Sequence, residues 1–293
     1  MASLESTTPL HLEDYLKDLP GLRTTGFQTS EVVTNRRGVA LLRGTLPDGS
    51  EAALKVVTPG AQATGPYDPM EMLQRETKWL CKYGSELAQG SYISDGLASD
   101  EHWLLMAWQQ GEPIDRWHRA HSDASDSLRK VYQAAAETVA KLHSAGQVHG
   151  DLQPSHLLVD EGNVKLIDFA LSHAPGNFNF RGAMVHFMAP ETAKKILENA
   201  PPLIDQLSET YSFGAVLFFS ATGKVPTAYA DPKAPIRDKL SAIAELGPTR
   251  SDLLQSLLPV ELGAVILACL QTRRADRIAS MDEVAERFAT ADL

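Results

Sequence analysis

The chain has 293 residues, of which 43% are apolar and 22% are charged, a balance typical of a globular protein. Its net charge of −10, with no basic run carrying interleaved aromatic residues, argues against a nucleic-acid-binding protein. The sequence has no apolar stretch suited to a membrane span and no signal-peptide pattern at its start, so we expect a cytoplasmic protein without a membrane partner. Two distant cysteines, Cys81 and Cys269, imply neither a disulfide framework nor a zinc site.

The first part of the chain predicts a short helix and then mainly strands. Residues 1–26 contain an amphipathic stretch that a Pro-Gly pair ends, and we expect this N-terminal extension to pack on the first lobe. Residues 27–57 are typical of three strands, the last two joined by a Pro-Asp-Gly turn. A helix is expected over 70–83, and two further strands are expected near 91–93 and 103–108.

After residue 108 the spacing of apolar residues becomes helical. An amphipathic helix that ends near Gly146 is indicated by Leu128, Val131, Tyr132, Ala135, Val139 and Leu142. Further helices are expected over 208–222, 236–246, 253–270 and 280–288. A small strand-rich half followed by a larger helical half predicts two lobes, residues 27–108 and residues 109–293.

Residues 149–171 carry the clearest functional pattern in the chain. Two carboxylates, Asp151 and Asp168, flank a turn and two short apolar strands that an Asp-Glu-Gly-Asn turn separates. This layout can place one carboxylate beside a hydroxyl nucleophile and the other on a metal bound to phosphates. The pattern therefore indicates phosphoryl transfer.

This segment closely resembles the catalytic and metal-binding loops of protein kinases, whose pattern is H-R-D-L-x-x-x-N followed by D-F-G. Lys55, on a predicted strand, precedes Glu76, on the next predicted helix. Asp151 and Asp168 follow in the order and spacing of the kinase arrangement. The resemblance implies that Asp151 is the catalytic base and that Asp168 holds Mg²⁺. It also implies that ATP binds as the phosphate donor. Lys55 with Glu76 would fix the α- and β-phosphates.

The resemblance continues into the helical half. The sequence MAPE at 188–191 is similar to the end of a kinase activation segment, and YSFG at 211–214 is similar to the start of the central helix. Arg277 stands where the family has the arginine that pairs with the glutamate of the first motif, here Glu191. The match covers about residues 27–290 and implies an α+β, bilobal protein-kinase fold, with a small β-rich N-lobe and a larger α-helical C-lobe.

Nucleotide-facing residues are implied in the same way. Adenine would bind backbone groups of Ala107 and Gln109, with Met106 at the back of the pocket. The glycine-rich loop departs from the family, because the segment TNRRGV retains only Gly38 of the pattern G-x-G-x-x-G. Side chains obstruct the close approach of backbone N–H groups to phosphate that glycines allow.

His156 stands where the family has the asparagine that binds a second magnesium ion. One interpretation makes His156 a metal ligand beside Asp168. Because imidazole is a poor ligand for Mg²⁺, a site with one metal or a preference for Mn²⁺ would follow. The alternative is a histidine that only forms a hydrogen bond near Asp151. The sequence leaves both open.

Further departures concern regulation and the acceptor. Gly150 replaces the arginine that pairs with a phosphorylated activation loop in many protein kinases. Gln153 replaces the lysine of serine/threonine kinases, and residues 183–185 lack their threonine. Glu209 fills the usual aspartate position at the start of the central helix. Neither the serine/threonine nor the tyrosine pattern is matched.

Two classes of function therefore remain. The first is an ATP-dependent phosphotransferase of protein-kinase type whose acceptor is a serine or threonine hydroxyl of a protein or peptide. One form of it is a precursor-peptide kinase that works with a separate lyase, a dedicated partner protein, in natural-product biosynthesis. The second is a pseudokinase that binds nucleotide or partner proteins without catalysis. Four retained charged residues favour the first class, whereas the degenerate glycine-rich loop and His156 favour the second.

Overall fold

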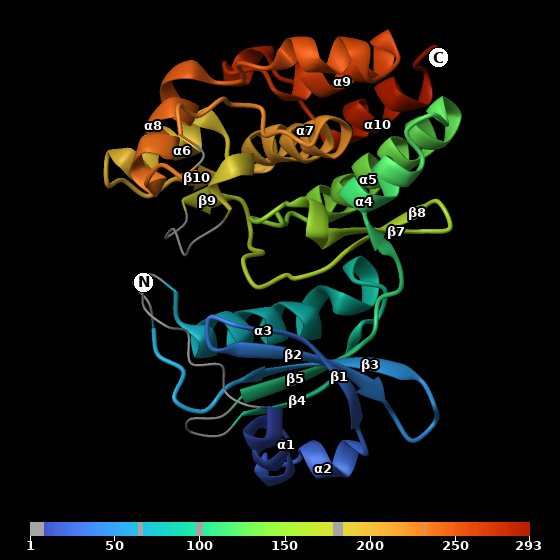
Figure 1. Ribbon diagram of the computed structural model, residues 1–293, viewed down its shortest axis with the longest axis vertical. Coiled ribbons are helices and arrows are strands. Elements are labelled where there is room, and N and C mark those ends of the chain that lie inside the picture. The colour runs from blue at the N-terminus through green and yellow to red at the C-terminus, as the bar shows by residue number, and fades with distance from the viewer. Residues whose placement is uncertain (1–8, 64–66, 98–101, 178–183, 232) are drawn as a thin grey trace. The chain divides into compact units, whose positions relative to one another are not determined.

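The computed structural model describes residues 9–63, 67–97, 102–177, 184–231 and 233–293 (Figure 1). Contacts divide the chain into two compact units, Met1–Trp108 and Gln109–Leu293. The first unit, the N-lobe, is organised around a five-stranded sheet, and the second unit, the C-lobe, is mainly helical. The predicted α+β fold with a β-rich lobe and a helical lobe is confirmed.

The N-lobe sheet has the strand order β1-β2-β3-β5-β4, and every neighbouring pair is antiparallel. Its strands are β1 (Gln28–Arg36), β2 (Val39–Thr45), β3 (Glu51–Val57), β4 (Tyr92–Leu97) and β5 (His102–Ala107). The predicted Pro-Asp-Gly turn joins β2 to β3, and its Gly49 adopts a φ of 84°, which glycine tolerates best. The strands lie close to their predicted positions.

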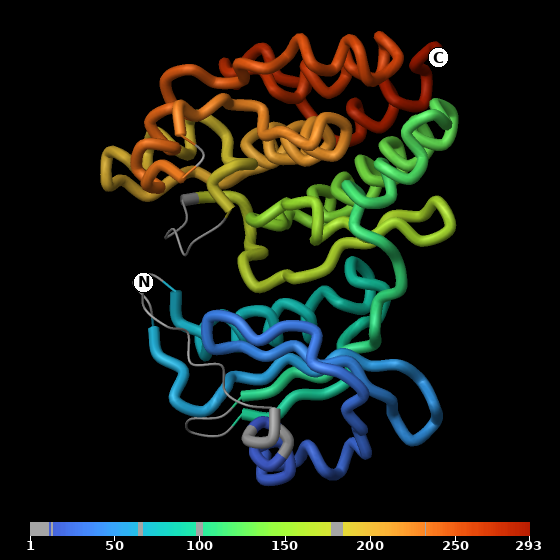
Figure 2. The backbone as a smooth tube through the Cα atoms, in the orientation of Figure 1, coloured from blue at the N-terminus to red at the C-terminus, as the bar shows by residue number. Residues whose placement is uncertain are grey.

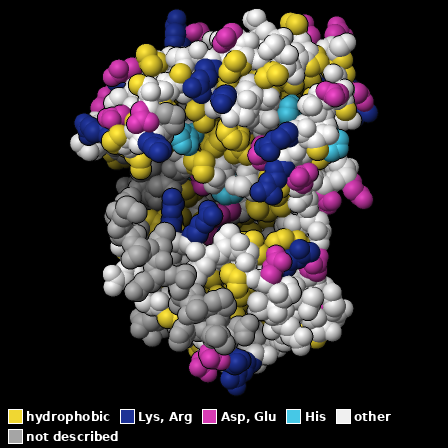
Figure 3. Space-filling view, viewed as in Figure 1, with side chains coloured by type: hydrophobic (Ala, Val, Ile, Leu, Met, Phe, Trp, Pro, Cys, Tyr) yellow, Lys and Arg dark blue, Asp and Glu magenta, His cyan; other side chains and the backbone are white. Residues whose placement is uncertain are grey.

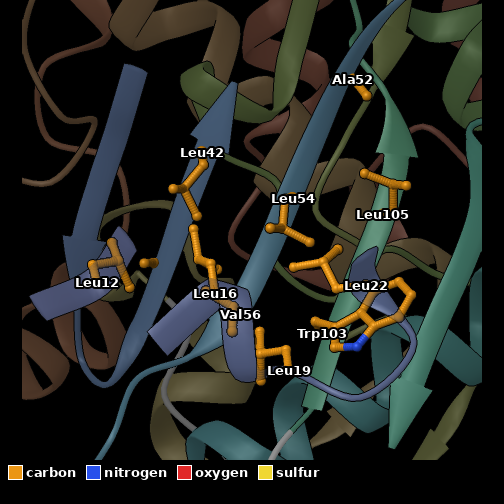
Figure 4. Packing of buried hydrophobic residues seen from close by; sticks show 11 residues of the cluster. Leu12, Leu16, Leu19, Leu22, Leu42, Ala52, Leu54, Val56, Trp103 and Leu105 are labelled. Carbon is orange, nitrogen blue, oxygen red and sulfur yellow. The ribbon is translucent and has the colours of Figure 1, made fainter. Parts of the chain in front are cut away.

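Alternate residues of β3 face opposite sides of the sheet, because side chains along a strand alternate with a period of two. Ala52, Leu54 and Val56 belong to a buried apolar cluster on one side (Figure 4). Lys55 lies on the other side and contacts Glu76, which a helix carries. One strand therefore supplies both core residues and the candidate phosphate-binding lysine.

Two helices, α1 (Pro9–Asp18) and α2 (Leu22–Thr25), precede the sheet. Leu12 and Leu16 of α1, Leu19 of the connecting segment and Leu22 of α2 lie in the same cluster as apolar residues of β2, β3 and β5 (Figure 4). Trp103 of β5 is 2% exposed, and its indole N–H donates to the carbonyl of Pro20 over 2.9 Å. The N-terminal segment is thus part of the N-lobe core.

Helix α3 (Pro69–Leu87) contacts β3, β4 and β5. The carboxylate of Asp68 fixes its start by accepting hydrogen bonds from the main-chain N–H groups of Met70 (2.9 Å) and Glu71 (3.3 Å). Pro69 follows at the first helical position, where its fixed φ is favourable and its missing N–H costs nothing. These local signals set the position of Glu76 along the helix.

The C-lobe is built mainly from helices. They are α4 (Ile114–Ala120), α5 (Ser125–Ser144), α6 (Pro190–Leu197), α7 (Gln206–Thr222), α8 (Ile236–Leu246), α9 (Val260–Cys269) and α10 (Met281–Ala289). Helix α7 is buried along most of its length, which is consistent with the many apolar residues of its sequence. Helix α10 lies beside α5 (Figures 1 and 2).

Two small sheets complete the C-lobe. One contains β6 (Glu112–Pro113), β7 (Leu157–Asp160) and β8 (Asn163–Leu166), and the other pairs β9 (Gly176–Asn177) with β10 (Leu203–Ile204). The β7–β8 hairpin is the predicted pair of strands between Asp151 and Asp168. Both residues of its turn have positive φ, as a two-residue hairpin turn requires.

One predicted helix, 253–270, is wrong in its extent. The structure has a 3₁₀ helix over Ser251–Ser256, and α9 begins only at Val260. Pro259 explains the break, because proline removes a backbone N–H and clashes with the preceding turn inside a helix. It instead occupies the N-cap position of α9.

The C-lobe surface is mixed in charge. On the face in Figure 3, basic and acidic side chains are interspersed with apolar ones over this lobe, so the net charge of −10 is not gathered into one patch there. Among the described residues, no helix combines the length and the apolar character needed to cross a membrane.

Candidate active site

Lys55 and Glu76 form a buried ion pair in the N-lobe. The Nζ atom of Lys55 lies 2.8 and 2.7 Å from the two carboxylate oxygens of Glu76, and the side chains are 15% and 3% exposed. Taking two charges out of water is costly, so a buried pair seldom adds net stability. The pair is therefore better explained by a function of its charges than by a contribution to folding.

The turn of α3 that carries Glu76 is held against β5. The hydroxyl of Thr77 donates to the carbonyl of Leu73 over 2.9 Å and lies 2.8 Å from Nε2 of His102. Since a hydroxyl has one proton, Nε2 is the donor in the second contact. Burial lowers the pKa of His102, which keeps the ring neutral. This contact holds in place the helical turn that carries Glu76.

A closed β-hairpin stands where the family has its glycine-rich loop. Arg36 of β1 pairs with Val39 of β2. Between them, Arg37 and Gly38 form a two-residue turn with φ values of 52° and 79°. A Cβ atom on Gly38 would lie 2.7 Å from the side chain of Ala61, so this position requires glycine. The sequence-predicted Gly38 is thus explained by the shape of the hairpin.

The predicted adenine-binding residues lie at the end of β5 and just after it. Met106 and Ala107 are its last two residues, and Gln109 is the first residue of the C-lobe. All three are partly buried. The N–H of Ala107 donates to the carbonyl of Ser91 over 2.7 Å, so this donor is engaged within the N-lobe.

Both carboxylate oxygens of Asp151 accept a hydrogen bond in the C-lobe. The main-chain N–H of Met184 donates to Oδ1 over 3.2 Å, and the amide of Gln153 donates to Oδ2 over 3.1 Å. Burial raises the pKa of Asp151 to about 6, with a smaller contribution from the charge of Asp168 and against the lowering effect of the Met184 hydrogen bond. A carboxylate with such a pKa is suited to accept a proton near neutral pH.

Asp168 has a φ of 66°, in the left-handed region that residues other than glycine rarely adopt. Such strained residues cluster at functional sites. Its neighbours are anchored, since Phe169 is 2% exposed and its ring centroid lies 5.4 Å from that of His149. His149 also donates from Nε2 to the carbonyl of Ile167 over 3.0 Å. The Asp168 side chain remains 39% exposed and accessible to a ligand.

His156 lies between the two carboxylates. Its Nδ1 is 2.9 Å from the main-chain carbonyl of Asp151, and its Nε2 is 3.6 Å from Oδ2 of Asp168. The amide nitrogen of Gln153 lies 2.9 Å from the same Nε2. Among the described residues, no group of three or more histidine, cysteine or acidic side chains is arranged to hold a metal ion.

Glu209 of α7 holds the main chain that precedes Asp151. It accepts hydrogen bonds from the N–H of Gly150 (2.8 Å) and the N–H of His149 (3.0 Å), and it lies 2.8 Å from Nε2 of His143. Burial opposes ionisation of Glu209, but these hydrogen bonds and the neighbouring histidines outweigh it and lower its pKa. The central helix therefore positions the loop that carries the candidate base.

Gly150 has a φ of 79°, and a Cβ atom on it would lie 2.6 Å from the carbonyl oxygen of Leu171. Gly146 is a matched control, since its φ is 67° and a Cβ atom there would meet nothing within 4 Å. Each glycine-to-alanine change should lower the free energy of unfolding by about 1–2 kcal/mol, because alanine disfavours the left-handed backbone conformation. Gly150→Ala should cost roughly 1–3 kcal/mol more, because of the overlap with Leu171. Urea denaturation measures both, and equal losses would contradict the steric explanation.

Glu191 and Arg277 form the ion pair that the sequence predicts. The guanidinium of Arg277 donates to both carboxylate oxygens over 2.9 and 3.1 Å. Arg274, which the sequence comparison did not single out, joins Glu191 (3.0 Å) to Asp205 (2.6 Å). This network ties the end of the activation segment to the start of α7. Residues 178–183 of that segment, including Ala183, lie outside the described residues.

A pocket adjoins Asp151 within the C-lobe. Its lining is mainly apolar and includes Leu152, Leu171, Met184, Phe187, Met188 and Ala189. Thr192, which is 2% exposed, also lines it, and its hydroxyl has no hydrogen-bond partner among the described residues. The candidate base thus lies beside an apolar surface with one unsatisfied polar group.

The Protein kinase domain family model matches residues 48–289. This match takes in β3 with Lys55, α3 with Glu76, and both carboxylates that flank the β7–β8 hairpin. Because it covers most of the sequence, the chain belongs to the protein kinase family.

Individual protein kinases are similar to the chain over shorter stretches. A probable serine/threonine-protein kinase of Clostridium acetobutylicum is 28% identical over 203 residues, which are 66% of this chain and 29% of that protein. The serine/threonine-protein kinase AfsK of Streptomyces coelicolor is 31% identical over 160 residues, 52% of this chain and 18% of AfsK. A probable receptor-like protein kinase of Arabidopsis thaliana is 26% identical over 231 residues, which are 74% of this chain and 45% of that protein. The chain spans less than half the length of each relative.

Sequence reasoning missed several contacts around Asp151. It treated Gln153 only as a missing lysine, although a polar side chain two residues from Asp151 in a proline-containing turn is a usable signal. The donor from Met184 is a main-chain group, so side-chain identity carries no information about it. His143 is far from Glu209 in sequence, and only the packing of α5 against α7 brings the two together.

Proposed function

We propose that the chain is an ATP-dependent phosphotransferase that transfers the γ-phosphate to a hydroxyl group of a protein or peptide. The formed Lys55–Glu76 pair carries this proposal, because kinase-type transfer requires such a pair to be in place. Lys55 would bind the phosphates, and Glu76 would hold its ammonium group. Adenine would contact backbone groups of Ala107 and Gln109, with Met106 beside it.

Asp168 would hold Mg²⁺. A carboxylate supplies the hard oxygen that Mg²⁺ prefers, and this side chain is accessible, so the residue fits the ion. The ion, when bound, neutralises charge on the phosphates. Asp151 would accept the proton of the substrate hydroxyl, for which its raised pKa is suitable.

For His156 we propose a hydrogen-bonding role rather than a metal-ligand role. Its Nδ1 faces the carbonyl of Asp151, and the amide of Gln153 lies over its ring. A neutral imidazole is also a poor ligand for Mg²⁺. One metal ion held by Asp168 is therefore the arrangement that the geometry favours.

A serine or threonine in a protein or peptide is the proposed acceptor. The apolar pocket beside Asp151 would receive a side chain that neighbours the acceptor residue. The similarity to serine/threonine kinases favours the same class. A small acceptor without such a side chain would leave this pocket unused.

Labelled ATP tests the proposal directly. With Mg²⁺ or Mn²⁺ and a serine- and threonine-containing peptide library, the chain should transfer label, and Asp168→Asn should reduce transfer at least about 100-fold, because charge stabilisation by the metal is lost. Asp160→Asn is the matched control, since Asp160 lies on the β7–β8 hairpin that precedes Asp168 and pairs with Lys165 at 2.7 Å. It should retain transfer.

Transfer that survives Asp168→Asn would show the assignment to be wrong. A pseudokinase would instead bind ATP, seen as a rise in melting temperature, and transfer no label with either metal. A precursor-peptide kinase would transfer label only when its peptide and its lyase partner are supplied.

A further inference from the structure

The turn after Asp151 brings two polar side chains back towards it. Gln153 is followed by a 3₁₀ helix, Pro154–His156, and the main-chain N–H of His156 donates to the carbonyl of Gln153 over 2.9 Å. Pro154 stabilises the turn, because its fixed φ suits the first helical position. The amide of Gln153 and the ring of His156, which is 7% exposed, consequently lie 2.9 Å apart.

The positions of the protons in this cluster follow from its partners. A carbonyl can only accept, so the contact of 2.9 Å to the Asp151 carbonyl places the proton of His156 on Nδ1. The Gln153 amide nitrogen lies 2.9 Å from Nε2 and 3.4 Å from Nδ1, so it sits over the face of the imidazole ring. An N–H of that amide donates to Oδ2 of Asp151. The amide is thus held between the Asp151 carboxylate and the His156 ring.

We propose that Gln153 is a positioning residue for Asp151. Its amide bridges the Asp151 carboxylate to the His156 ring, and the three residues form a clamp that holds the carboxylate in its reactive orientation. This inference rests on the proposed function. It gives His156 a defined role, which is to hold the Gln153 amide rather than to bind a second metal.

The clamp explains how the site can function without two side chains of serine/threonine kinases. Gln153 stands in the place of their lysine, and the main-chain N–H of Met184 donates from the segment that lacks their threonine. One donor engages each carboxylate oxygen of Asp151, so rotation of the carboxylate is restricted from both sides. Gln153 has no charge to bind phosphate, and its contribution is therefore orientation alone.

Steady-state kinetics test the positioning role. Gln153→Ala should lower kcat about 10- to 100-fold, because a small misplacement of a reacting group can cost a factor of that size, and KM for ATP should change less than about twofold. Ser155→Ala is the control, since Ser155 is exposed in the same turn. A rise in KM with unchanged kcat would assign Gln153 to nucleotide binding and overturn the proposal.

His156→Ala removes the other end of the clamp without introducing the asparagine that binds metal in the family. If Gln153 and His156 act as one unit, the double variant Gln153→Ala/His156→Ala should lose no more activity than the less active of the two single variants. Losses in kcat that multiply would mean that the two residues act independently, which contradicts the clamp.

The tautomer of His156 gives a result that needs no activity. Long-range ¹H–¹⁵N spectra, assigned by the loss of signals in His156→Ala, should show the proton on Nδ1 in the wild-type chain and altered Nε2 signals in Gln153→Ala. A proton on Nε2, or spectra that Gln153→Ala leaves unchanged, would overturn the clamp. If no substrate accepts phosphate, the proposed function fails, and the tautomer alone still decides whether the clamp exists.

Discussion

Asp151→Asn should reduce phosphate transfer by about 100- to 10,000-fold, the range that a positioned general base contributes. Asparagine keeps the shape of the side chain and can still accept the hydrogen bond from Met184. It cannot take the proton of a substrate hydroxyl, and its amide group opposes the amide of Gln153. ATP binding should persist, because Lys55 and Glu76 are unchanged. Single-turnover transfer and the ATP-induced rise in melting temperature measure the two effects separately.

The pH dependence identifies Asp151 further. The base must be ionised to accept a proton, and burial raises its pKa to about 6. Wild-type kcat/KM should therefore reach its maximum above this pH and decrease as the pH falls through about 6. The residual activity of Asp151→Asn should lack this acid limb.

Asp123→Asn is the control for loss of a carboxylate, because Asp123 is exposed and lies in the loop between α4 and α5. It should keep both the rate and the acid limb. A profile in which Asp151→Asn retains the wild-type limb would assign the proton transfer to another group.

The fold could be predicted because local and long-range signals agree in this chain. In β3, residues that alternate between the apolar cluster and the Lys55 side give the period of a strand, and the Pro-Asp-Gly turn fixes its pairing with β2. The order of Lys55, Glu76, Asp151 and Asp168 then identified the family. The break at Pro259 could also have been predicted from the proline. The apolar residues on both sides of it instead favoured one continuous helix.

The candidate site could be predicted only where a side chain has a position in a family pattern. Lys55 and Glu76 are such residues, and their pairing is present. The partners of Asp151 could not be obtained in this way. Met184 contributes its main chain, and Gln153 acts through an amide whose direction depends on His156. These contacts arise from the path of the backbone, which a pattern of residue types does not encode.

Loss of Glu209 should strongly affect stability. Its carboxylate is 3% exposed and satisfies three donors, namely the N–H groups of His149 and Gly150 and the ring of His143. Removing this carboxylate leaves each of these buried donors unsatisfied, which costs about 1–3 kcal/mol per group. Glu209→Ala should therefore lower the free energy of unfolding by about 3–5 kcal/mol, and it should also lower activity, because the loop before Asp151 loses its support.

A double-variant cycle separates the contact of Glu209 with His143 from its contacts with the backbone. His143→Ala should cost about 1–3 kcal/mol by itself, since it leaves one carboxylate oxygen with a single donor. If the pair acts as a unit, Glu209→Ala should cost less in the His143→Ala background, with a coupling of roughly 0.5–3 kcal/mol. Urea denaturation at pH 7 measures each variant, and the exposed Glu261→Ala on α9 should stay within about 0.5 kcal/mol of wild type. Strictly additive losses would mean that Glu209 stabilises the lobe through the two main-chain N–H groups alone.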